Sequence, residues 1–214
     1  MTSFSLPNDW SHPPRKSSNV LREIIKQHGT DCHLPANSKI SGDEFSQHVF
    51  AVETGEWLIR IDSAGVIGHL SKGSIFGVSN VIYDSGQQIY LDAIERSSYK
   101  KCPIEVFKEV FLREHNVAIA IADHFAWLNR MTEFYLTLMR QGGAYAKVKF
   151  SIEWLSKAPS IYRENISLIT FICDRTGVSK AHAHTILKQL KLGGYLEIES
   201  GFLLSVCKPL PNGY

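Results

Sequence analysis

The first hundred residues alternate short apolar runs with glycine-containing turns. A short helix is predicted over 20–28, with Leu21 on its apolar face and Gly29 at its end. Six runs rich in β-branched and aromatic residues then predict strands at 49–52, 57–61, 66–70, 74–78, 89–94 and 97–102. The turns between them are Thr54-Gly55, Ser63-Ala64-Gly65, Lys72-Gly73 and Asp84-Ser85-Gly86. Because helical crossovers do not fit between runs this close together, the pattern predicts an antiparallel β-sandwich or small barrel.

A long helical pattern follows these strands. Turn residues are missing between Pro103 and Gly142-Gly143, which predicts helix over this stretch, interrupted once near 114–116. The second half carries a heptad seam: Ala118, Ile121, Phe125, Leu128, Thr132, Tyr135 and Met139. A second apolar stripe lies beside it, formed by Trp127, Met131, Phe134 and Leu138.

A helix that is apolar on two faces must bury both of them. We therefore expect one face to pack on its own chain and the other to form a parallel homodimer. The alternative is a helix covered entirely by its own subunit. The predicted dimer interface consists of Ile121, Phe125, Leu128, Thr132, Tyr135 and Met139.

The last seventy residues follow the pattern of a winged helix-turn-helix. Helices are predicted at 147–155, 167–175 and 180–192, and strands at 195–199 and 202–206 around the turn Ser200-Gly201. Gly177 can adopt the positive φ that the tight turn between the second and third helices requires. Val178 is expected to fill the space between those helices, and Ser179 to cap the third.

The third helix separates an apolar face from a cationic one. Its inward positions are Ala183, Ile186, Leu187 and Leu190, and its outward positions are Lys180, His182, His184, Thr185, Lys188 and Lys191. Between Ser179 and Gly194 there is no carboxylate. A surface of one sign suits an element that lies against phosphates, since neutralising phosphates releases counterions.

These positions predict contacts to double-stranded DNA. We expect the first turns of the helix to reach base edges and the later turns to reach phosphates. The predicted DNA-binding residues are Ser179, Lys180, His182, His184, Thr185 and Lys188, with Lys180, His182 and Thr185 on bases and Ser179 and Lys188 on phosphate. Glu197 and Glu199 make the predicted wing a poor phosphate binder.

The composition restricts the possible classes of protein but does not by itself indicate a function. The chain has 214 residues, 44% of them hydrophobic and 21% charged, with a formal net charge of +2, so nucleic-acid binding would have to come from a local patch. No stretch resembles a transmembrane span or a secretory signal, and the four cysteines form no C-x-x-C pair. We therefore expect a cytoplasmic protein with reduced thiols and no membrane partner.

The turn and third helix, from Gly177 to Lys188, resemble the recognition segment of the catabolite-activator/fumarate-nitrate regulator superfamily. Lys72-Gly73-Ser74-Ile75-Phe76-Gly77 resembles that family's loop into the cyclic-nucleotide cassette, and Gly86-Gln87-Gln88 resembles its continuation. Residues 175–214 are also similar to an enterobacterial branch of regulators named for inhibiting hydrogen peroxide resistance, which implies a role in stress response. The resemblance covers 21–206 in element order and implies transcription regulation, with RNA polymerase as a candidate partner.

The same resemblance implies an effector pocket that has lost its nucleotide ligands. Cyclic-nucleotide binders of the family supply a glutamate after the Phe-Gly pair and an Arg-Ser step for the phosphate. Here these positions are Val78 after Gly77, and Ile89 with Tyr90. Because a partly buried phosphate needs a charge-assisted partner, we expect no cyclic-nucleotide binding in this degenerate pocket. The spacing of cysteines and histidines likewise predicts no metal, no iron–sulfur cluster and no other cofactor.

The predicted fold class is α+β: an N-terminal antiparallel, jelly-roll-like β-barrel, a long dimerisation helix and a C-terminal winged helix-turn-helix. The expected domains are a flexible arm (1–19), a cyclic-nucleotide-binding-like sensory barrel (20–103), a connecting and dimerisation helix (104–142) and the DNA-binding domain (143–214). No catalytic residues are expected. Two alternatives remain: a winged helix that binds protein instead of DNA, and a cupin-type metal enzyme, for which His33, His48 and His69 are too scattered.

Overall fold

The computed structural model describes residues 13–213 except 42–43, 45, 62–64 and 84–88. The chain divides into two compact units, one ending at Thr132 and the other beginning at Glu133. The boundary falls within one helix, α5 (His115–Gln141), so the backbone passes from one unit to the other without a loop. No helix in these described ranges has the length and apolar character that a membrane span needs.

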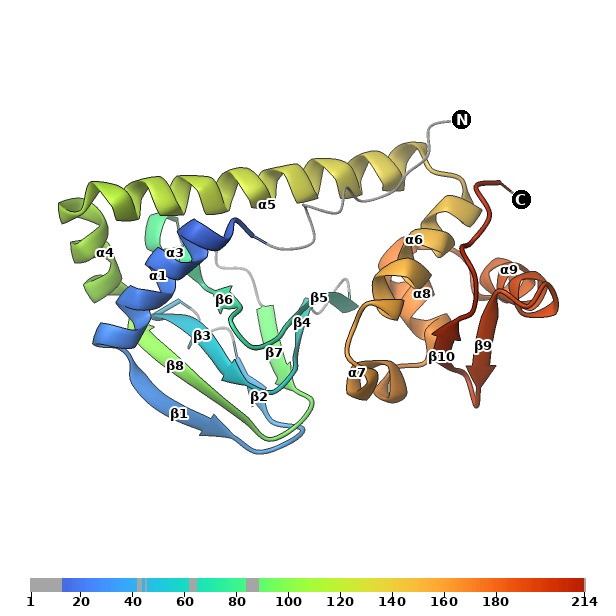
Figure 1. The fold of residues 1–214 in the computed structure, drawn as a ribbon, viewed down its shortest axis with the longest axis horizontal. Helices are drawn as coiled ribbons and strands as arrows, with labels where there is room; N and C mark the ends of the chain where they lie inside the picture. Colours follow the sequence, from blue (N-terminus) through green and yellow to red (C-terminus); the bar gives the residue numbers. More distant parts are fainter. Residues whose placement is uncertain (1–12, 42–43, 45, 62–64, 84–88, 214) are drawn as a thin grey trace. The chain divides into compact units, whose positions relative to one another are not determined.

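The N-terminal unit is built on two antiparallel sheets (Figure 1). One sheet has the strand order β1-β8-β3-β6 and the other β2-β7-β4-β5. The strands are β1 (Thr30–Leu34), β2 (Lys39–Ile40), β3 (His48–Thr54), β4 (Trp57–Ile61), β5 (Gly65–Leu70), β6 (Ile75–Phe76), β7 (Ile89–Ala93) and β8 (Ser97–Pro103). The helices are α1 (Arg15–His28), α3 (Val78–Ile82), α4 (Ile104–Arg113) and the first part of α5.

Strand β3 contributes side chains to two hydrophobic clusters of this unit. Its side chains alternate, so Phe50 and Val52 belong to a cluster with Trp57, Leu91 and Tyr99, which come from both sheets. Val49 and Ala51 belong to a second cluster, formed with the helices. This is why β3 is a continuous buried apolar run rather than an alternating one.

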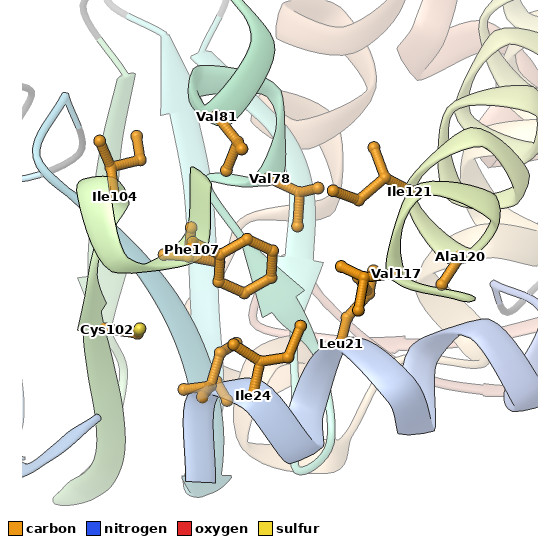
Figure 2. Packing of buried hydrophobic residues seen from close by; sticks show 13 residues of the cluster. Leu21, Ile24, Val78, Val81, Cys102, Ile104, Phe107, Val117, Ala120 and Ile121 are labelled. Carbon is orange, nitrogen blue, oxygen red and sulfur yellow. The ribbon is translucent and has the colours of Figure 1, made fainter. Parts of the chain in front are cut away.

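Phe107 of α4 lies at the centre of the second cluster (Figure 2). Leu21 and Ile24 of α1 approach it from one side and Val78 and Val81 of α3 from another. Val117, Ala120 and Ile121 of α5 close the cluster. The start of α5 is therefore fixed to its own unit by apolar burial.

The predicted strands agree with the structure except at 74–78. There the strand covers only Ile75–Phe76, and Val78 begins the short helix α3. Gly77 causes the change: its φ is 88°, and a Cβ at this position would come within 2.7 Å of the His48 carbonyl oxygen. The short strands β1 and β2 were not among the six predicted runs.

Two helix predictions have different outcomes. The predicted break near 114–116 is confirmed, because α4 ends at Arg113 and Glu114 is extended before α5 begins. Helix α1 begins at Arg15, so the assignment of 15–19 to a flexible arm is wrong. The side chain of Ser17 is buried and its hydroxyl donates to Asp123 Oδ2 at 2.7 Å, a contact that apolar periodicity does not reveal.

Several predicted features lie outside the described residues. These are the start of the arm (1–12), the centre of the turn Ser63-Ala64-Gly65, and the segment that holds Asp84-Ser85-Gly86 and Gly86-Gln87-Gln88.

The C-terminal unit packs four helices and a two-stranded hairpin after the end of α5. These elements are α6 (Ala144–Ser156), α7 (Ser160–Asn165), α8 (Leu168–Thr176), α9 (Lys180–Leu192), β9 (Leu196–Glu199) and β10 (Phe202–Val206). Helix α9 and strand β10 have the predicted bounds. The predicted helix at 147–155 begins earlier, at Ala144, and α7 was not predicted.

Glu56, in the turn between β3 and β4, makes the stability of the N-terminal unit depend on pH. Burial, and secondarily the neighbouring charge of Glu95, raise the pKa of Glu56 to about 7. The folded state therefore holds this proton where the unfolded state has lost it, and stability falls as pH rises from about 4.5 to about 7. Glu56→Gln should raise the melting temperature at pH 8, and this gain should vanish by pH 4.5.

Thermal unfolding followed by circular dichroism at both pH values measures this effect. Glu114→Gln, at an exposed position, is the matched control and should show no such gain. An equal gain for Glu56→Gln at pH 4.5 and pH 8 would contradict a titration effect.

Candidate nucleic-acid interface

The turn between α8 and α9 has the geometry of a helix-turn-helix. Gly177 ends α8 with φ 67°, and its N–H donates to the Cys173 carbonyl at 2.9 Å. The Thr176 hydroxyl donates to the Ile172 carbonyl and accepts from the N–H of Val178 at 3.2 Å. The positive φ predicted for Gly177 is confirmed.

Ser179 caps α9 as predicted. Its backbone is extended, and its hydroxyl accepts a hydrogen bond from the N–H of His182 at 3.3 Å. One of the free amides at the start of α9 is thereby satisfied, which fixes where the helix begins.

Ser179→Ala should lower the free energy of unfolding of the C-terminal unit by about 1 kcal/mol, since the amide of His182 loses its acceptor. Urea titration followed by circular dichroism measures the loss. Thr170→Ala, at an exposed position inside α8, is the control and should not destabilise. Equal unfolding midpoints for Ser179→Ala and the parent protein would contradict the capping role.

Helix α9 buries its apolar face and exposes its polar face, as its sequence predicts. The four inward side chains retain at most 7% of their surface exposed: Ala183, Ile186, Leu187 and Leu190. The six outward residues are all exposed: Lys180, His182, His184, Thr185, Lys188 and Lys191. Packing on α6, α8 and β9 therefore turns every cation of the helix to solvent.

The lysines of α9 form no ion pair with any carboxylate of the described residues. Among the described residues, the salt bridges include none to Lys180, Lys188 or Lys191. Lys191 Nζ instead donates to the Ile198 carbonyl at 3.2 Å. The surface of α9 thus presents uncompensated positive charge, as an anionic partner requires.

The hairpin β9–β10 stands beside α9 as a wing (Figure 1). Ser200 and Gly201 form its tip, both with positive φ, and the Gly201 carbonyl accepts from the N–H of Leu168 at 2.9 Å. Glu197 and Glu199 are exposed and alternate with Leu196 and Ile198, so they lie on the face of the wing away from its apolar side.

Arg175 forms a feature of this domain that the sequence patterns did not reveal. Its guanidinium carbon lies 4.6 Å from the ring centroid of Trp154 and 5.5–5.7 Å from those of Tyr135, Phe150 and Phe171. The Tyr135 hydroxyl donates to the Arg175 carbonyl oxygen. This aromatic cage (Tyr135, Phe150, Trp154 and Phe171) joins the end of α5, α6 and the first helix of the motif.

Within the described part of the chain, two nitrogen atoms of the caged guanidinium lack a hydrogen-bond acceptor. Nε and Nη1 are buried and have no hydrogen-bond partner among the described residues. Burial accordingly lowers the pKa of Arg175, although an arginine remains charged. Ring faces, not carboxylates, stabilise this cation.

The residues predicted for a dimer interface do not all face outward. Ile121 is only 3% exposed and belongs to the cluster around Phe107, so its assignment to the interface is wrong. Phe125 packs against the same cluster. The apolar residues of α5 that remain exposed include Ile119 (49%), Leu128 (37%) and Leu136 (54%). The heptad pattern combined buried and exposed positions, because apolar spacing does not tell which side chains the rest of the chain covers.

The predicted effector residues lie in different parts of the N-terminal unit. Val78 is 2% exposed and points into the helical cluster (Figure 2). Ile89 and Tyr90 are part-buried in β7, paired with Ile61 and Arg60 of β4. The described residues include no group of three histidine, cysteine or acidic side chains that could hold a metal ion.

Two of the four cysteines, Cys102 and Cys173, do not have the properties of redox sensors. Cys102 is fully buried, and burial raises its pKa to about 11. Burial also raises the pKa of Cys173, against the opposing effect of Lys180. A reactive thiol needs the opposite shift, toward thiolate at neutral pH.

Comparison with known proteins supports this architecture. Residues 144–212 match a family described as winged helix-turn-helix DNA binding. The protein named inhibitor of hydrogen peroxide resistance from Salmonella typhimurium is 24% identical over 200 residues, covering 91% of this chain and 94% of that protein. Its namesake from Escherichia coli K12 is 21% identical over 204 residues, covering 94% and 97%.

Three solved structures share the fold across most of the chain. The c-di-GMP-responsive global regulator CLP of Xanthomonas campestris has a TM-score of 0.62 at 14% identity, covering 89% of this chain and all of that one. FixK2 of Bradyrhizobium japonicum has a TM-score of 0.62 at 19% identity, covering 85% and 93%. A protein from Eubacterium rectale named for the Crp/Fnr family of transcriptional regulators has a TM-score of 0.65 at 12% identity, covering 87% and 89%.

Proposed function

We propose that this chain, which has the fold of the catabolite-activator/fumarate-nitrate transcription regulators and carries a winged helix-turn-helix DNA-binding domain, is a sequence-specific regulator that binds duplex DNA through α9. One observation carries the proposal: all three lysines of α9 are exposed on a helix that has no acidic residue. The fold is that of a transcription-regulator family, not of an enzyme family.

Individual roles follow from position along α9. Lys180, His182 and Thr185 lie in the first turns and are proposed to contact base edges in the major groove. Ser179 and Lys188 are proposed to contact phosphates, with His184 beside them. The carboxylates of the wing, Glu197 and Glu199, leave α9 as the main source of positive charge.

We propose that the protein acts as a homodimer. The exposed apolar side chains Leu128 and Leu136 support this proposal, because they lie about two turns apart on one side of α5 and a second copy of the helix would bury them. Two copies of α9 would then read half-sites of a pseudo-palindrome about one helical turn apart. Of the residues first predicted for the interface, Leu128 and Thr132 remain available, since both are exposed.

We further propose that the N-terminal unit does not bind cyclic nucleotides. Val78, which replaces the glutamate of the resemblance, is buried among apolar side chains, and Ile89 with Tyr90 offers no cation to a phosphate. Promoter binding would place RNA polymerase among the partners. The names of two relatives concern hydrogen peroxide resistance, and we propose target genes in the same stress response.

Genome-wide immunoprecipitation of the protein with its DNA tests the function. The parent protein should recover discrete sites that share a pseudo-palindromic sequence, and Lys180→Glu should lose them because it places a carboxylate against the duplex. Lys16→Glu, at an exposed position of α1, is the matched control and should retain the sites. Equal recovery by Lys180→Glu and the parent would contradict the contact between Lys180 and DNA, and a parent that recovers no discrete sites would favour a winged helix that binds protein.

A further inference from the structure

A groove lies between α9, the start of α8 and the wing. Its volume is about 390 Å³, within the range of sites that hold small organic ligands. Eight residues line it: Leu168, Ile169, His184, Leu187, Lys188, Lys191, Ile198 and Gly201. The hydrogen bond from Leu168 N–H to the Gly201 carbonyl holds the wing tip against α8, so the walls are fixed by backbone contacts.

The floor of this groove is apolar. Leu168 and Leu187 are buried beneath it, and Ile169 and Ile198 are only part-buried, so their side chains retain surface that solvent reaches. A floor of aliphatic side chains gives no hydrogen bond to a phosphate or a base. The floor favours a ligand with a hydrocarbon portion, because binding removes the apolar surfaces of both the floor and the ligand from water.

The rim of the groove is cationic. His184 and Lys188 lie one turn apart on α9, and Lys191 follows on the same side. Lys191 Nζ donates to the Ile198 carbonyl at 3.2 Å, which holds the ammonium across the groove from α9 to β9. An ammonium has three donors, so two remain for a ligand.

The nearby carboxylates do not neutralise this rim. Glu197 and Glu199 alternate with the wing residues whose side chains face the floor, and the Ser205 hydroxyl donates to Glu197 Oε2 on the opposite face. An apolar floor and uncompensated lysines therefore occur together in one groove, and none of the described residues that line it is acidic.

We propose that this groove binds a long-chain aliphatic carboxylate, with its hydrocarbon chain on Ile169 and Ile198 and its carboxylate between Lys188 and Lys191. Charge-assisted hydrogen bonds select the anion over a neutral lipid. Each further methylene on the floor should tighten binding up to about fourfold until the floor is filled.

The bound carboxylate competes with DNA, a consequence that rests on the proposed function. His184 and Lys188 belong both to the rim of the groove and to the surface assigned to the duplex. A carboxylate in the groove neutralises Lys188 and lies where a DNA phosphate would lie. The aliphatic carboxylate is thus a ligand that lowers DNA affinity.

Isothermal titration calorimetry on the full chain tests the site without DNA. Decanoate should bind, and hexanoate and 1-decanol should each bind at least tenfold more weakly, since one lacks hydrocarbon and the other lacks charge. Ile169→Glu should abolish decanoate binding, whereas Ile67→Glu, the same change at a 42% exposed isoleucine of the other unit, should not. Circular dichroism of both variants shows whether they fold.

Lys191→Met provides a second variant that leaves the floor intact. It should bind decanoate and 1-decanol about equally. The proposal would be overturned if the parent did not bind decanoate or bound 1-decanol equally well. It would also be overturned if folded Ile169→Glu or Lys191→Met bound decanoate as tightly as the parent does. Filter retention of a duplex, repeated with decanoate, separates the two claims: DNA retention without decanoate binding defeats only the groove, and decanoate binding without any DNA retention defeats only the proposed function.

Discussion

Arg175→Ala is expected to lower the free energy of unfolding of the C-terminal unit by about 2–4 kcal/mol, whereas Arg175→Met should change it by about 1 kcal/mol or less. Alanine leaves a void among the four rings of the aromatic cage, and neighbouring side chains fill such voids only in part. Methionine retains most of the volume and makes sulfur–aromatic contacts with the same rings.

The comparison of the two variants separates volume from charge. The guanidinium gains cation–π attraction, but Nε and Nη1 are desolvated and have no acceptor among the residues that the structure describes. Removing a poorly compensated buried charge is often neutral when the replacement packs well. Arg175 therefore acts mainly by filling the space between the end of α5, α6 and α8.

Hydrogen exchange measured by mass spectrometry over residues 144–176 reports the local stability of the C-terminal unit in both Arg175 variants. This measurement does not assume that the two units unfold together. Arg130→Ala, at an exposed arginine of α5, is the control and should leave exchange unchanged. If Arg175→Met exchanged as fast as Arg175→Ala, the charge rather than the volume would be the stabilising element.

Features determined by neighbours in the sequence were predicted well. The bounds of α9, the positive φ of Gly177 and the cap at Ser179 follow from local periodicity and from the backbone preferences of glycine and serine. The same local rules predicted which six side chains of α9 face solvent. The candidate DNA surface could therefore be identified residue by residue from the sequence.

Features determined by distant neighbours were not predicted. Ile121 and Leu128 share one heptad pattern, yet Ile121 is 3% exposed and Leu128 is 37% exposed, because only the first meets the cluster around Phe107. The cage of Arg175 draws its rings from positions 135, 150, 154 and 171, which no single period connects. Likewise, the groove beside the wing is lined by residues between 168 and 201 that come from α8, α9 and the hairpin, and the hydrogen bond from Leu168 N–H to the Gly201 carbonyl is one of the contacts that hold these elements together.

Lys188→Glu is expected to weaken DNA binding at least a hundredfold at physiological salt, for every duplex sequence alike. Lys188 is exposed on the second half of α9, where a helix in the major groove approaches phosphates rather than base edges. Lys188→Glu removes the attraction between the lysine and the phosphates, and it also places a negative charge beside the negatively charged DNA backbone. A contact to phosphate has no sequence information, so specific and nonspecific duplexes should lose affinity by similar factors.

The salt dependence of the milder change Lys188→Gln tests the same contact quantitatively. Each phosphate contact contributes about 0.9 to the slope of log affinity against log salt, so a monomer should lose about 1 and a dimer about 2 from the slope. Fluorescence anisotropy on one duplex between about 50 and 200 mM salt measures it. Lys16→Gln, on α1, should keep the parent slope. If Lys188→Gln had the same salt slope as the parent, Lys188 would not contact a phosphate. A decrease of about 2 in the slope would show that two copies of α9 bind one duplex.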